Sequence, residues 1–83
     1  MKAIFYLPRA RKALLRHRTE ADKIIAKIVA YAENPAAQIN NVKRLKGSVS
    51  LLRLRVGSYR VLFAEDENAL TIVDIGPRGS IYE

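Results

Sequence analysis

Hydrophobic residues in the first part of the chain recur with the period of an α-helix. An apolar run over residues 3–7, rich in β-forming side chains, predicts a short strand before the first helix. Over residues 8–17 and again over 21–32, apolar residues repeat on one side while basic and polar residues occupy the other, which predicts two amphipathic helices. Thr19 and Asp22 have the spacing of a capping box, so the second helix is expected to begin there.

The hydrophobic period changes to two in the second part of the chain. The Asn34-Pro35 pair ends the helical pattern, because the residue before a proline is driven out of the helical conformation, and residues 36–41 are expected to form a connection. Strict alternation of apolar and basic residues begins at Leu52. Strands are expected over residues 52–56, 59–64 and 70–75, with a further short one at 81–82.

Gly57-Ser58 fits a two-residue type II′ hairpin loop, and such a loop fixes the pairing of the strands on either side. Val56 then faces Tyr59, and the pairing continues outward from the loop, one residue at a time along both strands. One face of the hairpin becomes an apolar layer for the helices to cover. This layer consists of Leu52, Leu54, Val56, Tyr59, Val61 and Phe63.

The opposite face of the hairpin carries three arginines, Arg53, Arg55 and Arg60, and the register places Arg55 directly across from Arg60. Like charges placed opposite each other destabilise a sheet, so folding gains nothing from this pair. An anionic partner explains the pair, and guanidinium groups are suited to bidentate contacts with phosphate. The alternative is that the long arginine stems only cover apolar neighbours such as Leu62.

Composition places these patterns in a small basic protein. The chain has 83 residues and a formal net charge of +7, and at this length a single domain over residues 1–83 is expected. No apolar run approaches the roughly 20 residues that span a bilayer. Without cysteine there is no disulfide framework, thiolate metal site or cysteine nucleophile. We therefore expect a cytoplasmic protein, not attached to a membrane, with polyanions or acidic proteins as partners.

The positive charge is concentrated in one stretch. Residues 34–64 contain no acidic residue and six basic ones, which are Lys43, Arg44, Lys46, Arg53, Arg55 and Arg60. A basic surface that only keeps the protein in solution is one interpretation, and a phosphate-binding face is the other. The strand register favours the phosphate-binding face.

The catalytic groups that the sequence lacks narrow the possible chemistry. It has no glycine-rich phosphate loop and no set of metal-ligating residues at suitable spacing, so neither a cofactor nor a metal is expected. Cleavage of RNA by its own 2′-hydroxyl is compatible with the sequence, because arginines stabilise charge on the phosphate and a tyrosine stacks on a base. No residue is an obvious candidate for acid–base catalysis, since an arginine is effectively always protonated.

The chain resembles the RelE/ParE toxins of bacterial type II toxin–antitoxin modules. The resemblance rests on segments 42–47, 52–63, 75–78 and 81–82, which read VKRLKG, LRLRVGSYRVLF, IGPR and IY. It implies a small α+β fold in which two N-terminal helices pack on one face of a mainly antiparallel sheet of three or four strands. It also implies that the chain is the toxin of such a module and that an acidic antitoxin is its partner.

The RelE branch of this family implies a ribosome-dependent endoribonuclease that cleaves mRNA without a metal and so inhibits translation. The resemblance assigns Arg60 and Arg78 to the scissile phosphate and Tyr82 to stacking on the substrate nucleotide. Arg53 and Leu51 stand where the family has catalytic lysines, so Arg53 is a candidate catalytic residue while the general base is not identified. The candidate RNA-binding residues are Lys43, Arg44, Lys46 and Arg55.

The ParE branch implies the same fold with a different target. Its members inhibit DNA gyrase and are not nucleases. The matches at Arg60, Arg78 and Tyr82 favour the RelE branch, and the missing lysines keep the ParE branch open. A module that binds nucleic acid without any chemistry is a third alternative.

Overall fold

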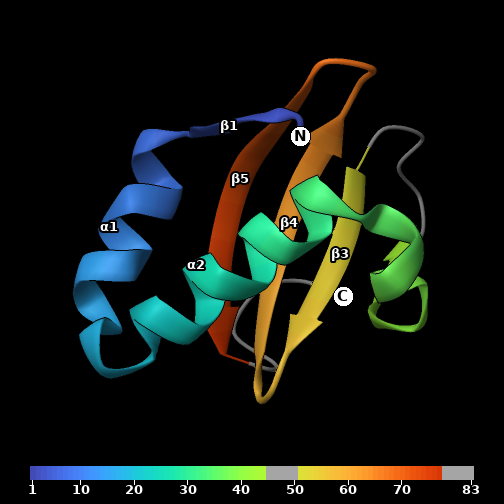
Figure 1. Cartoon of the computed structure of the whole chain (residues 1–83). Helices are drawn as coiled ribbons and strands as arrows, with labels where there is room; N and C mark the ends of the chain where they lie inside the picture. Colours follow the sequence, from blue (N-terminus) through green and yellow to red (C-terminus); the bar gives the residue numbers. More distant parts are fainter. Residues whose placement is uncertain (45–50, 78–83) are drawn as a thin grey trace.

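The computed structural model describes residues 1–44 and 51–77, in which a layer of helices covers one face of a twisted sheet (Figure 1). The helices are α1 (Pro8–Arg16), α2 (Arg18–Glu33) and the 3₁₀ helix η1 (Pro35–Asn41). The strands are β1 (Ala3–Tyr6), β2 (Val42–Arg44), β3 (Leu51–Val56), β4 (Tyr59–Glu65) and β5 (Ala69–Pro77). No helix in these ranges is long and apolar enough to cross a membrane.

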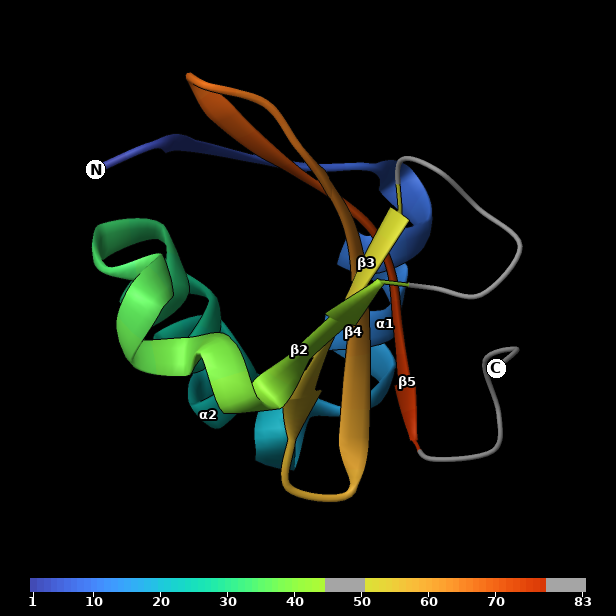
Figure 2. The same ribbon diagram turned by 90° about the vertical axis from the view of Figure 1, so that its right-hand side faces the viewer.

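The described strands form one sheet in the order β1-β5-β4-β3-β2. β1 pairs with β5 in parallel, and all other neighbours are antiparallel. Figure 2 shows the twist of the sheet, with α2 on one side of β3 and β4. The α+β class, the helices on one face and the mainly antiparallel pairing are confirmed. The expected strand number was wrong, because the sheet has five strands and not three or four.

β2 is the strand that the sequence did not predict. It has only three residues, too few to show a period of two, and it is recognised as a strand by its pairing with β3. The predicted connection over residues 36–41 also differs, since it lies within η1. The further strand expected at residues 81–82 lies outside the described residues.

The two main helices follow each other with only His17 between them. α1 begins at Pro8, where the missing backbone N–H of proline costs the helix nothing. α2 begins at Arg18 without a side-chain cap hydrogen bond, so the predicted capping box at Thr19 is wrong. Thr19 already lies inside the first turn of α2, where it cannot serve as the non-helical residue that caps a helix. The end of α2 before the Asn34-Pro35 pair is confirmed.

The register of the central hairpin is confirmed residue by residue. Val56 pairs with Tyr59, and Arg55 pairs with Arg60. Gly57 has a φ of 59°, and none of the other described residues except glycines has a positive φ. A positive φ at the first loop position alone is the pattern of a type II′ turn.

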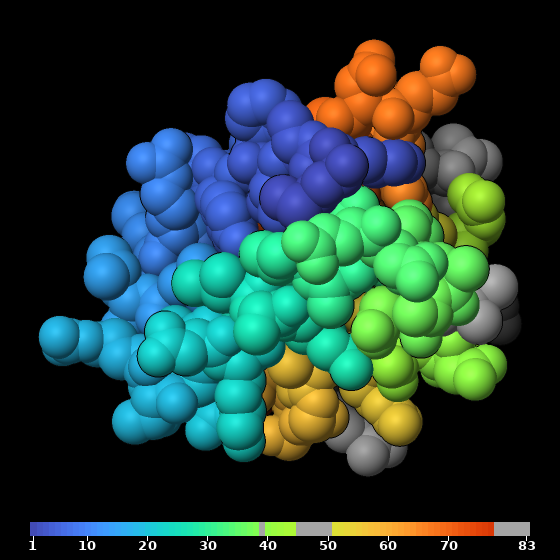
Figure 3. All heavy atoms as spheres, in the orientation of Figure 1, coloured from blue at the N-terminus to red at the C-terminus, as the bar shows by residue number. Residues whose placement is uncertain are grey.

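The apolar face of the hairpin forms the core beneath the helices. Leu54, Val61 and Phe63 are at most 1% exposed, and Ile24 and Ile28 of α2 pack against them. The space-filling view in Figure 3 shows α2 lying across the front of this part of the molecule, with α1 at the left side. Burial of this layer is what attaches the helices to the sheet.

A bulge in β5 adjusts which residues reach the core. Ile72 and Ile75 are both buried there, although strict alternation would place them on opposite faces. The pairing with β4 shifts by one residue at this point, which leaves Val73 to pack against Leu62 on the other face. Asp74 comes next, and its side chain lies near α1, with Oδ2 3.9 Å from Nε of Arg9.

Candidate nucleic-acid interface

β2, β3 and β4 gather basic side chains on the face of the sheet opposite α1 and α2. They surround a hollow of about 160 Å³, here termed the basic hollow. Its lining residues are Asn40, Asn41, Lys43, Arg53, Arg55 and Arg60. None of these described lining residues is acidic and four are basic, a composition that favours anions.

Two pairs of like charges face each other in the basic hollow. The register places Arg55 across from Arg60, as predicted, and β2 adds a second pair by placing Lys43 across from Arg53. A favourable cross-strand pair contributes roughly 0.2–1 kcal/mol, whereas a like-charged pair opposes sheet formation. Like-charged side chains thus stand opposite each other at two neighbouring places, and a phosphate bound there would be attracted by both members of a pair.

The arginines of the basic hollow differ in burial. Arg55 is exposed, whereas Arg53 and Arg60 are half-buried. A charge near low-dielectric protein interacts more strongly with an anion than a fully hydrated charge does. Arg60 also pairs with Gly76 near the end of β5, immediately before Pro77. Arg53 and Arg60 are therefore the best placed of the described arginines to hold a phosphate firmly.

The structure brings together only some of the predicted site residues. Those that meet in the basic hollow are Lys43, Arg53, Arg55 and Arg60. Arg44 does not join them, because it follows Lys43 on β2 and lines another hollow. The predicted residues Lys46, Arg78 and Tyr82 lie outside the described residues.

Asn40 and Asn41 were not predicted as site residues from the sequence. Both residues lie at the end of η1, directly before β2, and their amides add hydrogen-bond donors and acceptors to a cationic hollow. The side-chain nitrogen of Asn41 donates to Oε1 of Gln38 at 3.3 Å. The one sequence feature that could have indicated them is their position immediately before the first basic residues of the acid-free stretch.

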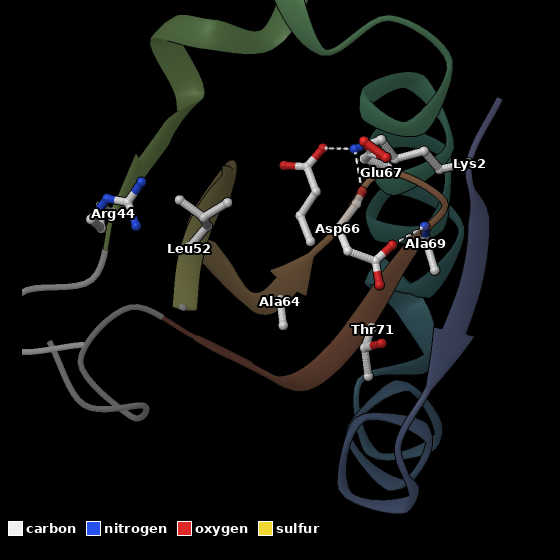
Figure 4. Close-up of a pocket in the computed structure, with 9 residues that line it drawn as sticks. Lys2, Arg44, Leu52, Ala64, Asp66, Glu67, Ala69 and Thr71 are labelled. Atoms are coloured by element: carbon white, nitrogen blue, oxygen red, sulfur yellow. Dashed lines mark hydrogen bonds and ion pairs between the residues drawn. The ribbon is translucent and has the colours of Figure 1, made fainter. Parts of the chain in front are cut away.

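A second hollow, at the turn between β4 and β5, has a mixed charge (Figure 4). It has a volume of about 620 Å³, and its charged lining residues are Lys2, Arg44, Glu65, Asp66 and Glu67. Nζ of Lys2 lies 2.6 Å from Oε2 of Glu65 and donates to the carbonyl oxygen of Asp66 at 2.6 Å. Opposite charges are therefore paired within the protein here.

Burial and hydrogen bonds around this second hollow shift two pKa values. The hydroxyl of Tyr31 donates to Oε1 of Glu65 at 2.6 Å. Burial, reinforced by this bond to a carboxylate, raises the pKa of Tyr31. Oδ1 of Asp66 accepts the backbone N–H groups of Asn68 and Ala69, both at 2.8 Å, and these bonds lower the pKa of Asp66. The turn and the network at Glu65 thus join β1, α2 and β4.

Comparison with known proteins gives one family and several similar folds. The family model of the ParE toxin of the type II toxin–antitoxin system, parDE, matches residues 4–82. The crystal structure of an archaeal RelE–RelB complex from Pyrococcus horikoshii OT3 has 21% identity and a TM-score of 0.75, and covers 96% of this chain and 98% of that chain. A YafQ variant from E. coli has 14% identity and a TM-score of 0.77 over 100% of both chains.

A third similar structure is the YoeB dimer from Staphylococcus aureus, with 16% identity and a TM-score of 0.65 over 88% of this chain and 92% of that chain. Comparison with curated protein sequences gave no match. At these identities the solved structures show a shared fold, and the family model extends over nearly the whole chain. The chain belongs to the RelE/ParE family of toxins of type II toxin–antitoxin systems.

Proposed function

We propose that this toxin is a ribosome-dependent endoribonuclease that cleaves mRNA. The observation that carries the proposal is the basic hollow, where two like-charged pairs face each other and none of the described lining residues is acidic. Such a hollow is suited to an RNA backbone. The structural similarity to RelE, YafQ and YoeB supports the assignment.

In the proposed reaction, the 2′-hydroxyl of the RNA gives its proton to solvent water and its oxygen forms a bond to the adjacent phosphorus, while the bond to the 5′-oxygen breaks and this oxygen takes up a proton. Arg60 and Arg53 hold the non-bridging oxygens of this phosphate and stabilise the charge that develops on them. Arg55 lies at the exposed side of the hollow and binds a neighbouring phosphate. Arg78 and Tyr82 keep the roles that the family resemblance implies, phosphate contact and base stacking.

Proton transfer needs groups other than the arginines, which keep their protons. Lys43 is the amine that lines the basic hollow, and it stands directly across from Arg53. We assign Lys43 as the proton donor to the departing 5′-oxygen. It would thereby supply the ammonium group that is missing at Arg53 and Leu51.

Mapping of mRNA 5′ ends after expression of the protein tests the proposed function. Loss of a group that stabilises transition-state charge typically lowers a rate by roughly 100- to 1000-fold, and we expect Arg60→Ala to lose this much cleavage. Lys23→Ala, an exposed residue of α2, removes the same charge elsewhere and should leave the cuts unchanged. Cuts that persist at full strength in Arg60→Ala would contradict the role of Arg60.

Inhibition of DNA gyrase is the second candidate function, because the matching family model is that of the ParE toxin. Expression would then cause DNA breaks and an SOS response without mRNA cleavage. That result would support the gyrase target and rule out the nuclease.

We further propose an acidic antitoxin as the partner of this toxin. The net charge of +7 favours an acidic binding segment, and the similar structure from Pyrococcus horikoshii is itself a RelE–RelB complex. An acidic segment that covers the basic hollow would neutralise its opposed pairs and exclude RNA. Full inhibition by an antitoxin that leaves the basic hollow accessible to RNA would contradict this arrangement.

A further inference from the structure

A groove between α1 and the end of β5 carries basic side chains that the proposed function does not use. It has a volume of about 510 Å³ and is here termed the α1 groove. Its charged or titratable lining residues are Arg9, Lys12, Arg16, His17 and Asp74. Among the described residues, none lines both the α1 groove and the basic hollow. α1 packs along β5, as Figure 1 shows.

Three cations follow one face of α1. Arg9, Lys12 and Arg16 are spaced as i, i+3 and i+7, and all three are exposed, while Ala10 and Ala13 on the other side are buried. At about 1.5 Å of rise per residue, the row is about 10 Å long. The row is therefore long enough to contact more than one phosphate of a nucleic-acid backbone.

Asp74 is the carboxylate of the α1 groove, and one of its oxygens is anchored. Oδ1 accepts the backbone N–H of Ile75 at 2.8 Å. Oδ2 lies 3.9 Å from Nε of Arg9, on a side chain that is 19% exposed. A carboxylate repels phosphate, so a groove for phosphate alone would be better without it. It accepts a hydrogen bond from a hydroxyl, and the 2′-hydroxyl is the donor that distinguishes RNA from DNA.

His17 does not compete for this role. Its Nδ1 lies 3.1 Å from the hydroxyl of Tyr59, and the two rings are in edge contact. The remaining charged groups of the α1 groove are the helix row and Asp74, which forms an ion pair with Arg9. An acidic protein segment would meet repulsion at Asp74 and gain nothing from it, whereas the backbone of RNA can use both.

We propose that the α1 groove is a second nucleic-acid site, which binds the sugar–phosphate backbone of structured RNA. Arg9, Lys12 and Arg16 bind successive phosphates, and Asp74 accepts the hydrogen bond of a 2′-hydroxyl. This site holds RNA independently of the basic hollow, and it exists whether or not the protein cleaves mRNA.

Binding of a labelled RNA hairpin to the full chain, followed by fluorescence anisotropy over a range of salt concentrations, tests the helix row. Each lost phosphate contact reduces the log–log salt slope by about one, so Lys12→Ala with Arg16→Ala should reduce it by about two. The matched control is Lys23→Ala with Lys27→Ala on α2, which removes the same charge. If both double variants lose equal affinity and slope, the attraction is general and the α1 groove is not a site.

Asp74 is tested with the same hairpin in a 2′-fluoro form, which keeps the helical shape but lacks the hydroxyl donor. A hydrogen bond to a charged group corresponds to a preference of about tenfold for the hydroxyl form. We expect Asp74→Ala to abolish this preference and to bind both hairpins more tightly. Asp74→Asn keeps an acceptor oxygen and should keep the preference. A preference that survives in Asp74→Ala would overturn the role of this carboxylate.

Two further measurements separate this site from its alternatives. Each variant is also combined with Arg60→Ala, and additive losses in binding show that the α1 groove and the basic hollow act independently. If polyglutamate displaces RNA from the native chain but not from the Lys12/Arg16 double variant, and no 2′-hydroxyl preference exists, the groove binds protein and the proposal is wrong. Thermal unfolding confirms that every variant is folded. A failure to cleave mRNA leaves these binding results unaffected.

Discussion

The two faces of the sheet use the same strands for opposite purposes. Along β4, Val61 and Phe63 point into the core and are at most 1% exposed, while Arg60 between Tyr59 and Val61 lines the basic hollow. The helix-covered face gains free energy from burial of apolar area, and the opposite face loses some through like-charged pairs. Neighbouring residues along a strand point to opposite faces of the sheet. A substitution at one position can therefore change stability, while a substitution at the next changes charge.

The largest effect is expected on the helix-covered face. Phe63→Ala removes a ring that is 1% exposed and lies 5.2 Å from the ring of Tyr31, between centroids. Such a truncation costs about 3–5 kcal/mol of the free energy of unfolding, which urea denaturation measures. If this variant does not fold, Ile28→Val gives a measurable loss of about 0.5–1.5 kcal/mol at the same layer. A loss below this range would show that the helices contribute less to the core than burial indicates.

A smaller effect is expected at the border between the faces, where Tyr31 donates to Glu65. Loss of a hydrogen bond to a carboxylate in Tyr31→Phe should cost about 1–2 kcal/mol. Because the folded state raises the pKa of Tyr31, the bond contributes fully at neutral pH. Its contribution declines as the pH rises above about 10, where tyrosines of the unfolded chain ionise. Between pH 8 and 11, the free energy of unfolding of Tyr31→Phe should therefore vary less with pH than that of the native chain. An equal dependence in the two proteins would argue against this bond.

The smallest effect, with the opposite sign, is expected on the face with the basic hollow. Arg55→Gln removes the repulsion from Arg60 across the hairpin and should raise the free energy of unfolding by roughly 0.2–1 kcal/mol. The same variant should bind RNA more weakly and with a lower salt slope. A variant that loses both stability and RNA binding would show that Arg55 is a structural residue, and the contrast between the two faces would then not hold at this position.

Much of the fold could be predicted because it depends on neighbours in sequence. The two-residue loop at Gly57-Ser58 determines the hairpin register, and the helical period determines α1 and α2. β1 was recognisable as a strand, but nothing local indicates its parallel pairing with β5. β2 was too short to show alternation, and its place depends on β3 already being present.

The candidate site could likewise be predicted only where it depends on residues that are close in sequence. Arg55 and Arg60 follow from the hairpin alone, whereas Lys43 reaches Arg53 only through β2. The position of Asp74 beside α1 depends on the bulge in β5, which arises from the packing of distant residues in one core. Sequence periodicity reports local alternation and therefore carries no information on such long-range adjustments.

The place of β5 in the sheet has a consequence for biosynthesis. β5 is the latest described strand in the chain, yet it lies between β1 and β4 and joins the N-terminal strand to the rest of the sheet. While the protein is being translated, the edge of β1 and the edge of β4 that later pair with β5 have no partner until residues 69–77 have emerged. Contacts between such distant segments also slow folding. The sheet can therefore close only after β5, the last of the described strands in chain order, has been synthesised.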